Sequence, residues 1–249
     1  MNSLEKMIGI LDLFDAGDDA AAISFEDLCT KLGYTRSTLY RYLKTLTDAG
    51  LLASLPSVGY MLGPRIIEFD YKIRTADLLI HAARPFMEEL SERFKAVALL
   101  CRRYRFHVLC VHQETGPDAI HSNYERGRTR SLLHGAASVA ILAYLPEHQL
   151  RKLYSLSEQT FAEAGFGTTL KGVKETLKHH RERGWVLTTG DVTPGAVGIA
   201  APVFDARAEV IGSLSLTLKE SHTRIAAAEE IAERLTLCAD ILSKTLIRG

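Results

Sequence analysis

The spacing of hydrophobic residues at the start of the chain predicts three short helices. Apolar positions repeat at helical intervals over residues 3–16, at Leu4, Met7, Ile8, Leu11 and Phe14. Ser24, followed three positions later by Asp27, is an approximate capping box for a second helix that Gly33 ends. Thr35 is a good N-cap for a third helix, which runs to about residue 49 before Gly50.

The turn between the second and third helices and the segment after them predict a winged helix-turn-helix. The turn is three residues long, as in helix-turn-helix motifs. Two short apolar segments then follow, residues 51–55 and 58–62, separated by Pro56 and Ser57, which predicts a β-hairpin, the wing. Pro64 suits the first turn of the next helix.

The rest of the chain alternates between strand and helix patterns. Strands are predicted at 96–101, 106–113, 197–204 and 210–218, and helices at 82–94, 136–145, 170–183 and 222–247. Most of these strands are joined as hairpins, which favours an α+β domain with a mostly antiparallel sheet. We expect a DNA-binding domain over 1–63, a linker helix over 64–80 and a second domain over 81–249.

With 249 residues, the chain is long enough to bury a hydrophobic core without disulfides. Cys29, Cys101, Cys110 and Cys238 are scattered, without a CxxC pair, as expected for reduced thiols. The N-terminal residues do not read as a signal peptide, and no segment has the roughly 20 apolar residues that span a bilayer. We therefore expect a cytoplasmic protein without a membrane partner.

The overall charge of the chain does not support a DNA-binding domain at its N-terminus. The net charge of the chain is zero, and in residues 1–78 eleven acidic residues outnumber eight basic ones. Attraction to phosphate acts over about one Debye length, however, so the local sign matters more. Between residues 28 and 47 every ionic residue is basic, namely Lys31, Arg36, Arg41 and Lys44.

The third helix separates an apolar stripe from a polar face. Leu39, Tyr42, Leu43 and Leu46 form the stripe. A helix that enters the major groove needs long donors that reach base edges and hydroxyls or cations that hold phosphates. The candidate DNA-binding residues are Lys31, Thr35, Arg36, Ser37, Thr38, Tyr40, Arg41 and Lys44, together with Tyr60 on the wing.

Three local motifs of this region resemble the DNA-binding domain of the isocitrate lyase regulator (IclR) family. They are Thr35-Arg36-Ser37-Thr38-Leu39-Tyr40-Arg41-Tyr42-Leu43, Ala49-Gly50-Leu51, and Gly59-Tyr60-Met61-Leu62-Gly63-Pro64-Arg65. Later stretches, Gly184-Trp185, Pro194-Gly195 and Ile199-Ala200-Ala201-Pro202-Val203-Phe204-Asp205, resemble the second domain of that family, a GAF-like effector-binding fold. The resemblance covers essentially the whole chain. It implies a transcriptional regulator, a repressor by our expectation, that forms a homodimer or a dimer of dimers on a palindromic operator.

The resemblance also implies a small organic acid as effector of the second domain. Gly135 and Ala136 open a helix with small residues, whose bare amides would bind a carboxylate. The other pocket positions are only partly kept: Thr188 replaces an Asp, Gly198 replaces a Cys, and the hydroxyls of Ser215 and Thr217 remain. Asp191 is a substitute acceptor or an exposed loop residue. Because Gly in place of Cys enlarges a cavity, we expect a bulkier acid than glyoxylate or pyruvate.

Two other readings of the second domain stay open at this point. In the first, the second domain is an enzyme with Cys101 or Cys110 as a nucleophile beside a histidine. In the second, the domain only forms oligomers and binds no effector. Both cysteines lie in strand-like apolar runs, where a neutral thiol is the default, so we expect no enzyme. His107 and His112, five apart on a strand and expected on opposite faces, and the adjacent His179 and His180 lack metal-ligand spacing, so we expect no metal and no cofactor.

Overall fold

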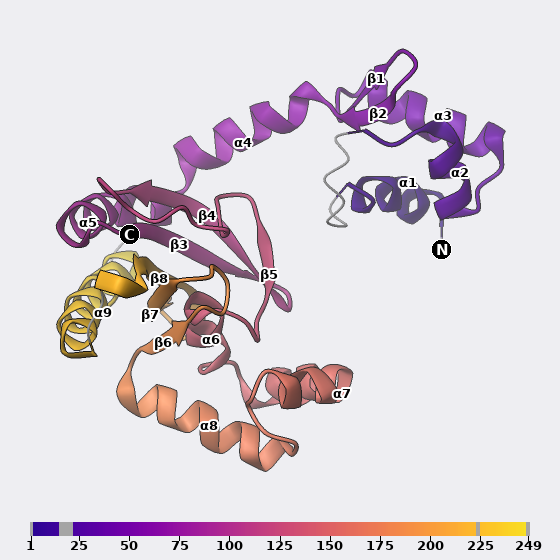
Figure 1. Ribbon diagram of the computed structural model, residues 1–249. Helices are drawn as coiled ribbons and strands as arrows, with labels where there is room; N and C mark the ends of the chain where they lie inside the picture. Colours follow the sequence, from indigo (N-terminus) through magenta and orange to yellow (C-terminus); the bar gives the residue numbers. More distant parts are fainter. Residues whose placement is uncertain (1, 15–21, 223–224, 248–249) are drawn as a thin grey trace. The chain divides into compact units, whose positions relative to one another are not determined.

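The computed structural model describes residues 2–14, 22–222 and 225–247 (Figure 1). The chain forms two compact units, Met1–Asp77 and Leu78–Gly249. Each unit has a hydrophobic core of its own.

The first unit begins with the three predicted helices, α1 (Ser3–Asp12), α2 (Phe25–Leu32) and α3 (Arg36–Asp48). Ser24 and Thr35 cap α2 and α3, because their side chains accept hydrogen bonds from amides three residues on. Gly33 ends α2 in the left-handed conformation that favours glycine. Helix α1 is shorter than predicted, and residues 15 and 16 of that prediction lie outside the described residues.

The wing consists of strands β1 (Leu52–Leu55) and β2 (Gly59–Leu62), paired antiparallel. A backbone bridge also ties Tyr60 to Ile23, with N–O distances of 2.8 and 2.9 Å. Gly59 permits this approach, because a Cβ there would lie 2.3 Å from the Ile23 carbonyl oxygen. The wing is therefore fixed to the segment before α2 as well as to the end of α3.

Among the described residues, eight buried side chains form the core of the first unit: Ile10, Ile23, Leu28, Leu39, Tyr42, Leu43, Leu46 and Leu52. The predicted apolar stripe of α3 supplies four of them. Helix α4 (Pro64–Ala76) follows with proline in its first turn and contains no buried residue.

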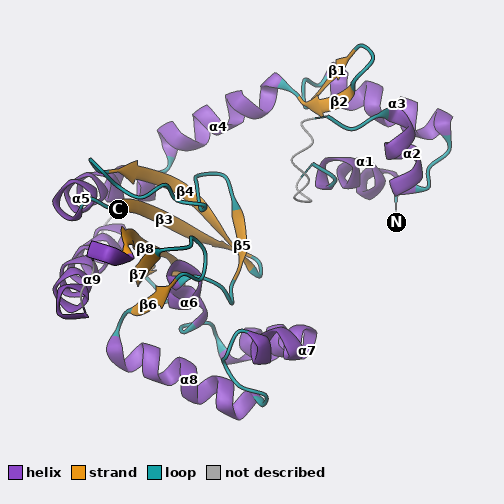
Figure 2. Ribbon diagram, viewed as in Figure 1, coloured by secondary structure: helices purple, strands orange, loops and turns teal. Residues whose placement is uncertain are grey.

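The second unit is built on one antiparallel sheet with strand order β5-β4-β3-β8-β7-β6 (Figure 2). Its strands are β3 (Val97–Tyr104), β4 (His107–Thr115), β5 (Thr129–Ser131), β6 (Val186–Thr189), β7 (Ala196–Phe204) and β8 (Val210–Lys219). Every strand pair is antiparallel, as predicted from the hairpin connections.

Helices cover both faces of this sheet (Figure 1). Helices α5 (Leu78–Phe94) and α9 (Ile225–Ile247) pack on one face, with a short 3-10 turn (Glu220–His222) before α9. Helices α6 (Ala136–Leu142), α7 (Glu147–Glu163) and α8 (Leu170–Arg183) lie on the other. On β8 the side chains alternate accordingly, since Leu214, Leu216 and Leu218 join the α5–α9 core and the residues between them carry hydroxyls toward α6.

A β-bulge at Val111 corrects one expectation. Leu100 pairs with His112 but Cys101 pairs with Cys110, so Val111 is an extra residue that reverses the alternation of β4. His112 therefore lies beside Leu100, on the α5 side, where alternation also places His107 opposite Tyr104. The prediction that the two histidines point to opposite faces is wrong.

Candidate functional site

The polar face of α3 is exposed to solvent. Arg36, Ser37, Tyr40, Arg41 and Lys44 are all exposed, while the stripe on the opposite side of the helix is buried. Tyr40 in particular is 61% exposed, although a tyrosine with an intramolecular role would bury its ring. The helix thus presents two guanidinium groups, one ammonium group and hydroxyls on one surface.

Hydroxyl groups cluster at the start of α3. The Thr35 side chain accepts from the Thr38 amide at 3.4 Å, and its Oγ1 donates to Thr38 Oγ1 at 2.9 Å. Ser37 Oγ lies 3.3 Å from Thr35 Oγ1. These groups lie beside the first backbone amides of a 13-residue helix, where an anion is favoured.

One acidic residue lies against this surface, which the sequence window of residues 28–47 left out. Glu26 on α2 accepts from Arg36 Nη2 at 3.3 Å, with both side chains about 70% exposed. The Arg36 guanidinium also lies 4.9 Å from the centre of the Phe25 ring. Arg36 is therefore held toward α2, and the surface is not free of acids in space.

We expect Glu26→Gln to strengthen DNA binding by roughly two- to fivefold, since an exposed ion pair is worth at most about 1 kcal/mol. The gain should be similar on specific and random duplexes and should shrink with added salt. Fluorescence anisotropy with a labelled duplex at low and high salt measures it, with Glu68→Gln on α4 as the control. An unchanged affinity would mean that Arg36 does not approach the DNA.

The remaining DNA-binding candidates differ in exposure. Lys31 is exposed in the last turn of α2. Tyr60 is only partly exposed, because its ring packs on the core of the first unit. The wing turn exposes Val58, and residues 51–63 contain no Lys or Arg. The wing can therefore offer hydroxyls to phosphate but no cation.

In the second unit, a small cavity lies between the sheet and the start of α6. All seven predicted effector-binding residues line it: Gly135, Ala136, Thr188, Asp191, Gly198, Ser215 and Thr217. We call this space the first cavity. Its other lining residues include Leu99, Tyr124, Arg130, His134 and Ser138.

The first cavity is small, and the expectation that Gly198 makes room for a bulkier acid stays a prediction. Its volume is about 40 Å³, room for only a few water-sized groups. A Cβ at position 198 would lie 3.1 Å from Thr188 Oγ1 and 3.3 Å from Ala136 Cβ. These two residues occupy the space that a larger side chain would fill.

We expected the amide of Gly135 to be unpaired, but it already has a hydrogen-bond partner within the chain. Asp191 Oδ2 accepts its N–H at 2.5 Å, and Asp191 Oδ1 lies 3.8 Å from His134 Nδ1. Asp191 thus points back to the start of α6 instead of lying free in its loop. The carboxylate of Asp191 therefore occupies the position that we predicted for the carboxylate of a ligand.

Sequence reasoning missed the polar groups that complete the first cavity. Arg130 lies with its guanidinium 4.7 Å from the Tyr124 ring centre and donates to the Asn123 carbonyl at 2.9 Å. Burial lowers the pKa of Arg130 and raises that of Tyr124. Arg130 precedes the Leu132–Ser138 stretch by two residues, so its basic charge was the available signal.

Three buried polar atoms among the described residues have no hydrogen-bond partner and line this cavity. They are Arg130 Nε, Ser138 Oγ and Ser215 Oγ. The serines are only 1% and 3% exposed, respectively. Because buried polar groups are almost always paired, these atoms mark a place for a polar ligand or water.

The cysteines proposed for the enzyme alternative are buried in the core. Cys101 and Cys110 face each other across β3 and β4. The hydrogen bond to Cys110, and burial, raise the pKa of the Cys101 thiol well above its usual value. A neutral, buried thiol is a poor nucleophile.

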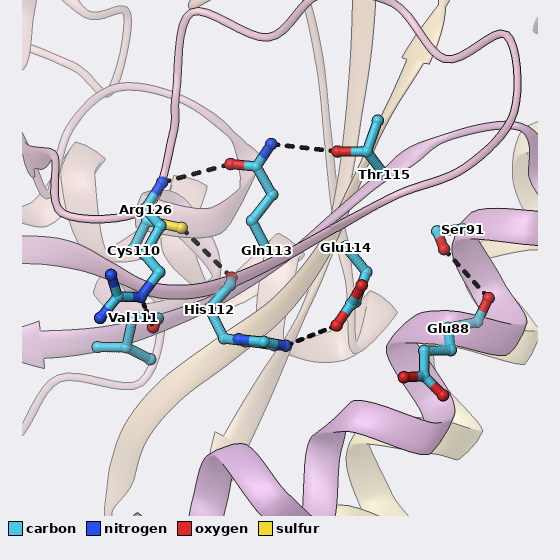
Figure 3. A network of polar contacts seen from close by, with 9 residues as sticks. All are labelled: Glu88, Ser91, Cys110, Val111, His112, Gln113, Glu114, Thr115 and Arg126. Atoms are coloured by element: carbon cyan, nitrogen blue, oxygen red, sulfur yellow. Dashed lines mark hydrogen bonds and ion pairs between the residues drawn. The ribbon is translucent and has the colours of Figure 1, made fainter. Parts of the chain in front are cut away.

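A second polar network lies around the bulge in β4 (Figure 3). His112 Nε2 lies 2.8 Å from Glu114 Oε1, and Cys110 Sγ donates to the His112 carbonyl at 3.4 Å. Arg126 Nε donates to the Val111 carbonyl at 3.0 Å. These contacts stabilise the irregular strand. Within the described residues no group of three or more side chains is placed to hold a metal ion.

None of the described helices is long and apolar enough to cross a membrane.

Comparison with known proteins agrees with this arrangement. Residues 3–56 match the family model for the IclR helix-turn-helix domain, and residues 73–244 match that for the bacterial transcriptional regulator IclR C-terminal domain. The chain is similar to the HTH-type transcriptional regulator XynR of Escherichia coli K12, at 26% identity over 99% of this chain and 97% of the relative. It is also similar to the DNA-binding transcriptional repressor YiaJ of the same organism, at 24% identity over 86% and 77%.

A solved structure has the same fold. The IclR transcriptional regulator of Alicyclobacillus acidocaldarius superposes with a TM-score of 0.79 at 22% identity and covers 97% of both chains. The two relatives are transcriptional regulators, not enzymes. The chain belongs to the IclR family of DNA-binding transcriptional regulators.

Proposed function

We propose that α3 enters the major groove of an operator and reads its sequence. The observation that carries this proposal is the surface of α3, on which Arg36, Tyr40, Arg41 and Lys44 are exposed opposite a buried stripe. Arg41 and Arg36 contact base edges in this proposal. The groups assigned to phosphates are Lys31, Thr35, Ser37, Thr38, Lys44 and the Tyr60 hydroxyl.

We further propose that two copies of the chain bind a palindrome, as a homodimer or a dimer of dimers. Helix α4 supports this, because it buries no side chain within its unit and exposes Ile67 (71%), Phe69, Tyr71 and Ile73. Ile67 and Tyr71 share one side of the helix and Phe69 and Ile73 the other, so both sides offer exposed apolar side chains to a second copy. In this arrangement residues 1–63 bind DNA, 64–80 form the linker and 81–249 form the effector-binding domain.

A small organic acid is our proposed effector, with the first cavity as its site. Arg130 and His134 supply positive charge or donors, and the unpaired Ser138 and Ser215 hydroxyls supply further hydrogen bonds. The acid changes regulation by binding differently to the DNA-competent and DNA-incompetent arrangements. We propose repression as the sign of regulation, by analogy with the relative whose name is transcriptional repressor.

A binding assay tests the proposed function directly. The full-length protein is titrated onto the DNA upstream of its own gene and onto random DNA, with and without a panel of carboxylic acids, while light scattering gives the mass of the complex. We expect tighter binding to the upstream DNA, an even number of protomers, and an acid that shifts the affinity. Equal affinity for both duplexes would contradict operator reading, and a monomer would contradict the dimer.

A further inference from the structure

A second, larger cavity adjoins the first and has no role in the function proposed above. Its volume is about 480 Å³, within the range of small-molecule sites. Its apolar walls include Leu133, Val139, Phe166 and Val186, and Glu163 and His180 are among its polar lining. Its lining is mixed, because hydroxyl, carboxylate and imidazole groups lie beside the apolar side chains, so it suits the body of an organic ligand that carries polar groups as well as carbon.

Four residues line both cavities and form the wall between them: His134, Thr188, Gly190 and Asp191. Two contacts hold Asp191 in this wall, Oδ2 on the Gly135 amide at 2.5 Å and Oδ1 at 3.8 Å from His134 Nδ1. The Asp191 side chain is one third exposed, so it can leave these contacts for solvent without a large desolvation cost.

The Asp191 carboxylate leaves part of the first cavity unsatisfied. Arg130 Nε, Ser138 Oγ and Ser215 Oγ have no partner while Asp191 is bound to Gly135. A free carboxylate that entered the cavity could bind the Gly135 amide and these donors together. It would gain hydrogen bonds that Asp191 does not make.

We propose that Asp191 is an internal competitor for the effector carboxylate, and that its displacement joins the two cavities so that the body of the effector lies in the second. The inference rests on the proposed function and names its ligand class: an organic acid with a body of about six or more carbons. The first cavity alone, at about 40 Å³, holds little more than the acid group.

The sign of one mutation separates this role from the ordinary one. If Asp191 accepted a hydrogen bond from the ligand, Asp191→Ala would weaken binding. As a competitor it must be displaced from a charged hydrogen bond, so its removal strengthens binding by about tenfold or more.

The experiment measures Kd by calorimetry on the full-length protein with two matched pairs of acids, pyruvate with phenylpyruvate and acetate with phenylacetate. The variants are Asp191→Ala, two that fill the second cavity, Ala164→Phe and Thr189→Phe, and Glu175→Ala on the exposed surface of α8 as control. We expect the phenyl acid of at least one pair to bind about tenfold tighter than its small partner. Asp191→Ala tightens it further, either filling variant weakens it at least tenfold, and the control leaves it unchanged.

Each other outcome overturns the inference. Tighter binding of the small acids, with no effect of the filling variants, places the ligand in the first cavity alone and leaves the proposed function intact. Weaker binding to Asp191→Ala makes Asp191 a ligand acceptor. Absence of binding by all four acids overturns the inference, whereas the panel of carboxylic acids on the upstream DNA tests the proposed acid effector separately.

Discussion

Leu43→Ala is expected to destabilise the first unit by about 2–5 kcal/mol and to abolish DNA binding at ordinary temperature. Leu43 is fully buried, it belongs to a core with eight buried side chains among the described residues, and it lies on α3 itself. A unit of this size has a total stability of roughly 4–12 kcal/mol, so the loss removes a large part of it. The DNA-binding surface then fails because its helix no longer has a core to lie on.

The single tryptophan allows this loss to be located. Trp185 is buried in the core of the second unit, so its fluorescence during urea unfolding reports that unit. We expect the fluorescence transition to stay in place, while hydrogen exchange of the α3 amides rises and DNA binding is lost. Leu4→Ala, at a side chain 66% exposed, is the matched control and should change stability by about 0.5 kcal/mol or less. Unchanged exchange in Leu43→Ala would contradict this account of the core.

The helices and strands could be predicted from the sequence wherever a local signal, such as a capping residue or an apolar stripe, marked the element. Thr35 and Gly50 bracket α3, the apolar stripe of α3 is the buried one, and residues 170–183 form α8 as predicted. Helix α7 was missed, because its apolar residues are few and Ser157 interrupts its helical geometry (φ −149°). Strands β5 and β6, of three and four residues, are too short to show a periodic pattern.

The candidate sites were predictable as residues but not as contacts. The family resemblance brought seven residues together, and the structure places them around one cavity. The pairing of Asp191 with Gly135 joins residues 56 apart in sequence, and the pairing of Glu26 with Arg36 joins two helices. Neither contact leaves a periodic signal, because each depends on how the elements pack. The bulge at Val111, which changes the face of His112, has the same origin.

The net charge of the chain does not indicate DNA binding. The ion pairs made by individual basic residues are more informative. Arg36 has an acidic partner in Glu26, whereas no ion pair involves Arg41 within residues 2–14, 22–222 and 225–247. A guanidinium without a competing carboxylate keeps its donors for an external acceptor. Arg41 is therefore the residue for which we propose the main base contact.

Arg41→Ala is expected to weaken binding to the operator by about 1–3 kcal/mol per contacted half-site, which is roughly five- to 150-fold, and binding to random DNA much less. The Arg41 guanidinium is exposed, 5.4 Å from the centre of the Tyr42 ring at the middle of α3, where a long side chain reaches base edges. Anisotropy titrations with operator and random duplexes at one salt concentration measure the two losses.

Two further variants separate base reading from charge. Arg41→Lys keeps the charge but loses the two parallel donors, so it should retain affinity for random DNA and lose much of the preference for the operator. Lys44→Ala should weaken both complexes alike and lower the salt slope by about one unit per head, as expected for a phosphate contact. Equal losses on both duplexes for Arg41→Ala, with Arg41→Lys restoring both, would make Arg41 a phosphate contact and leave Arg36 as the base-reading residue.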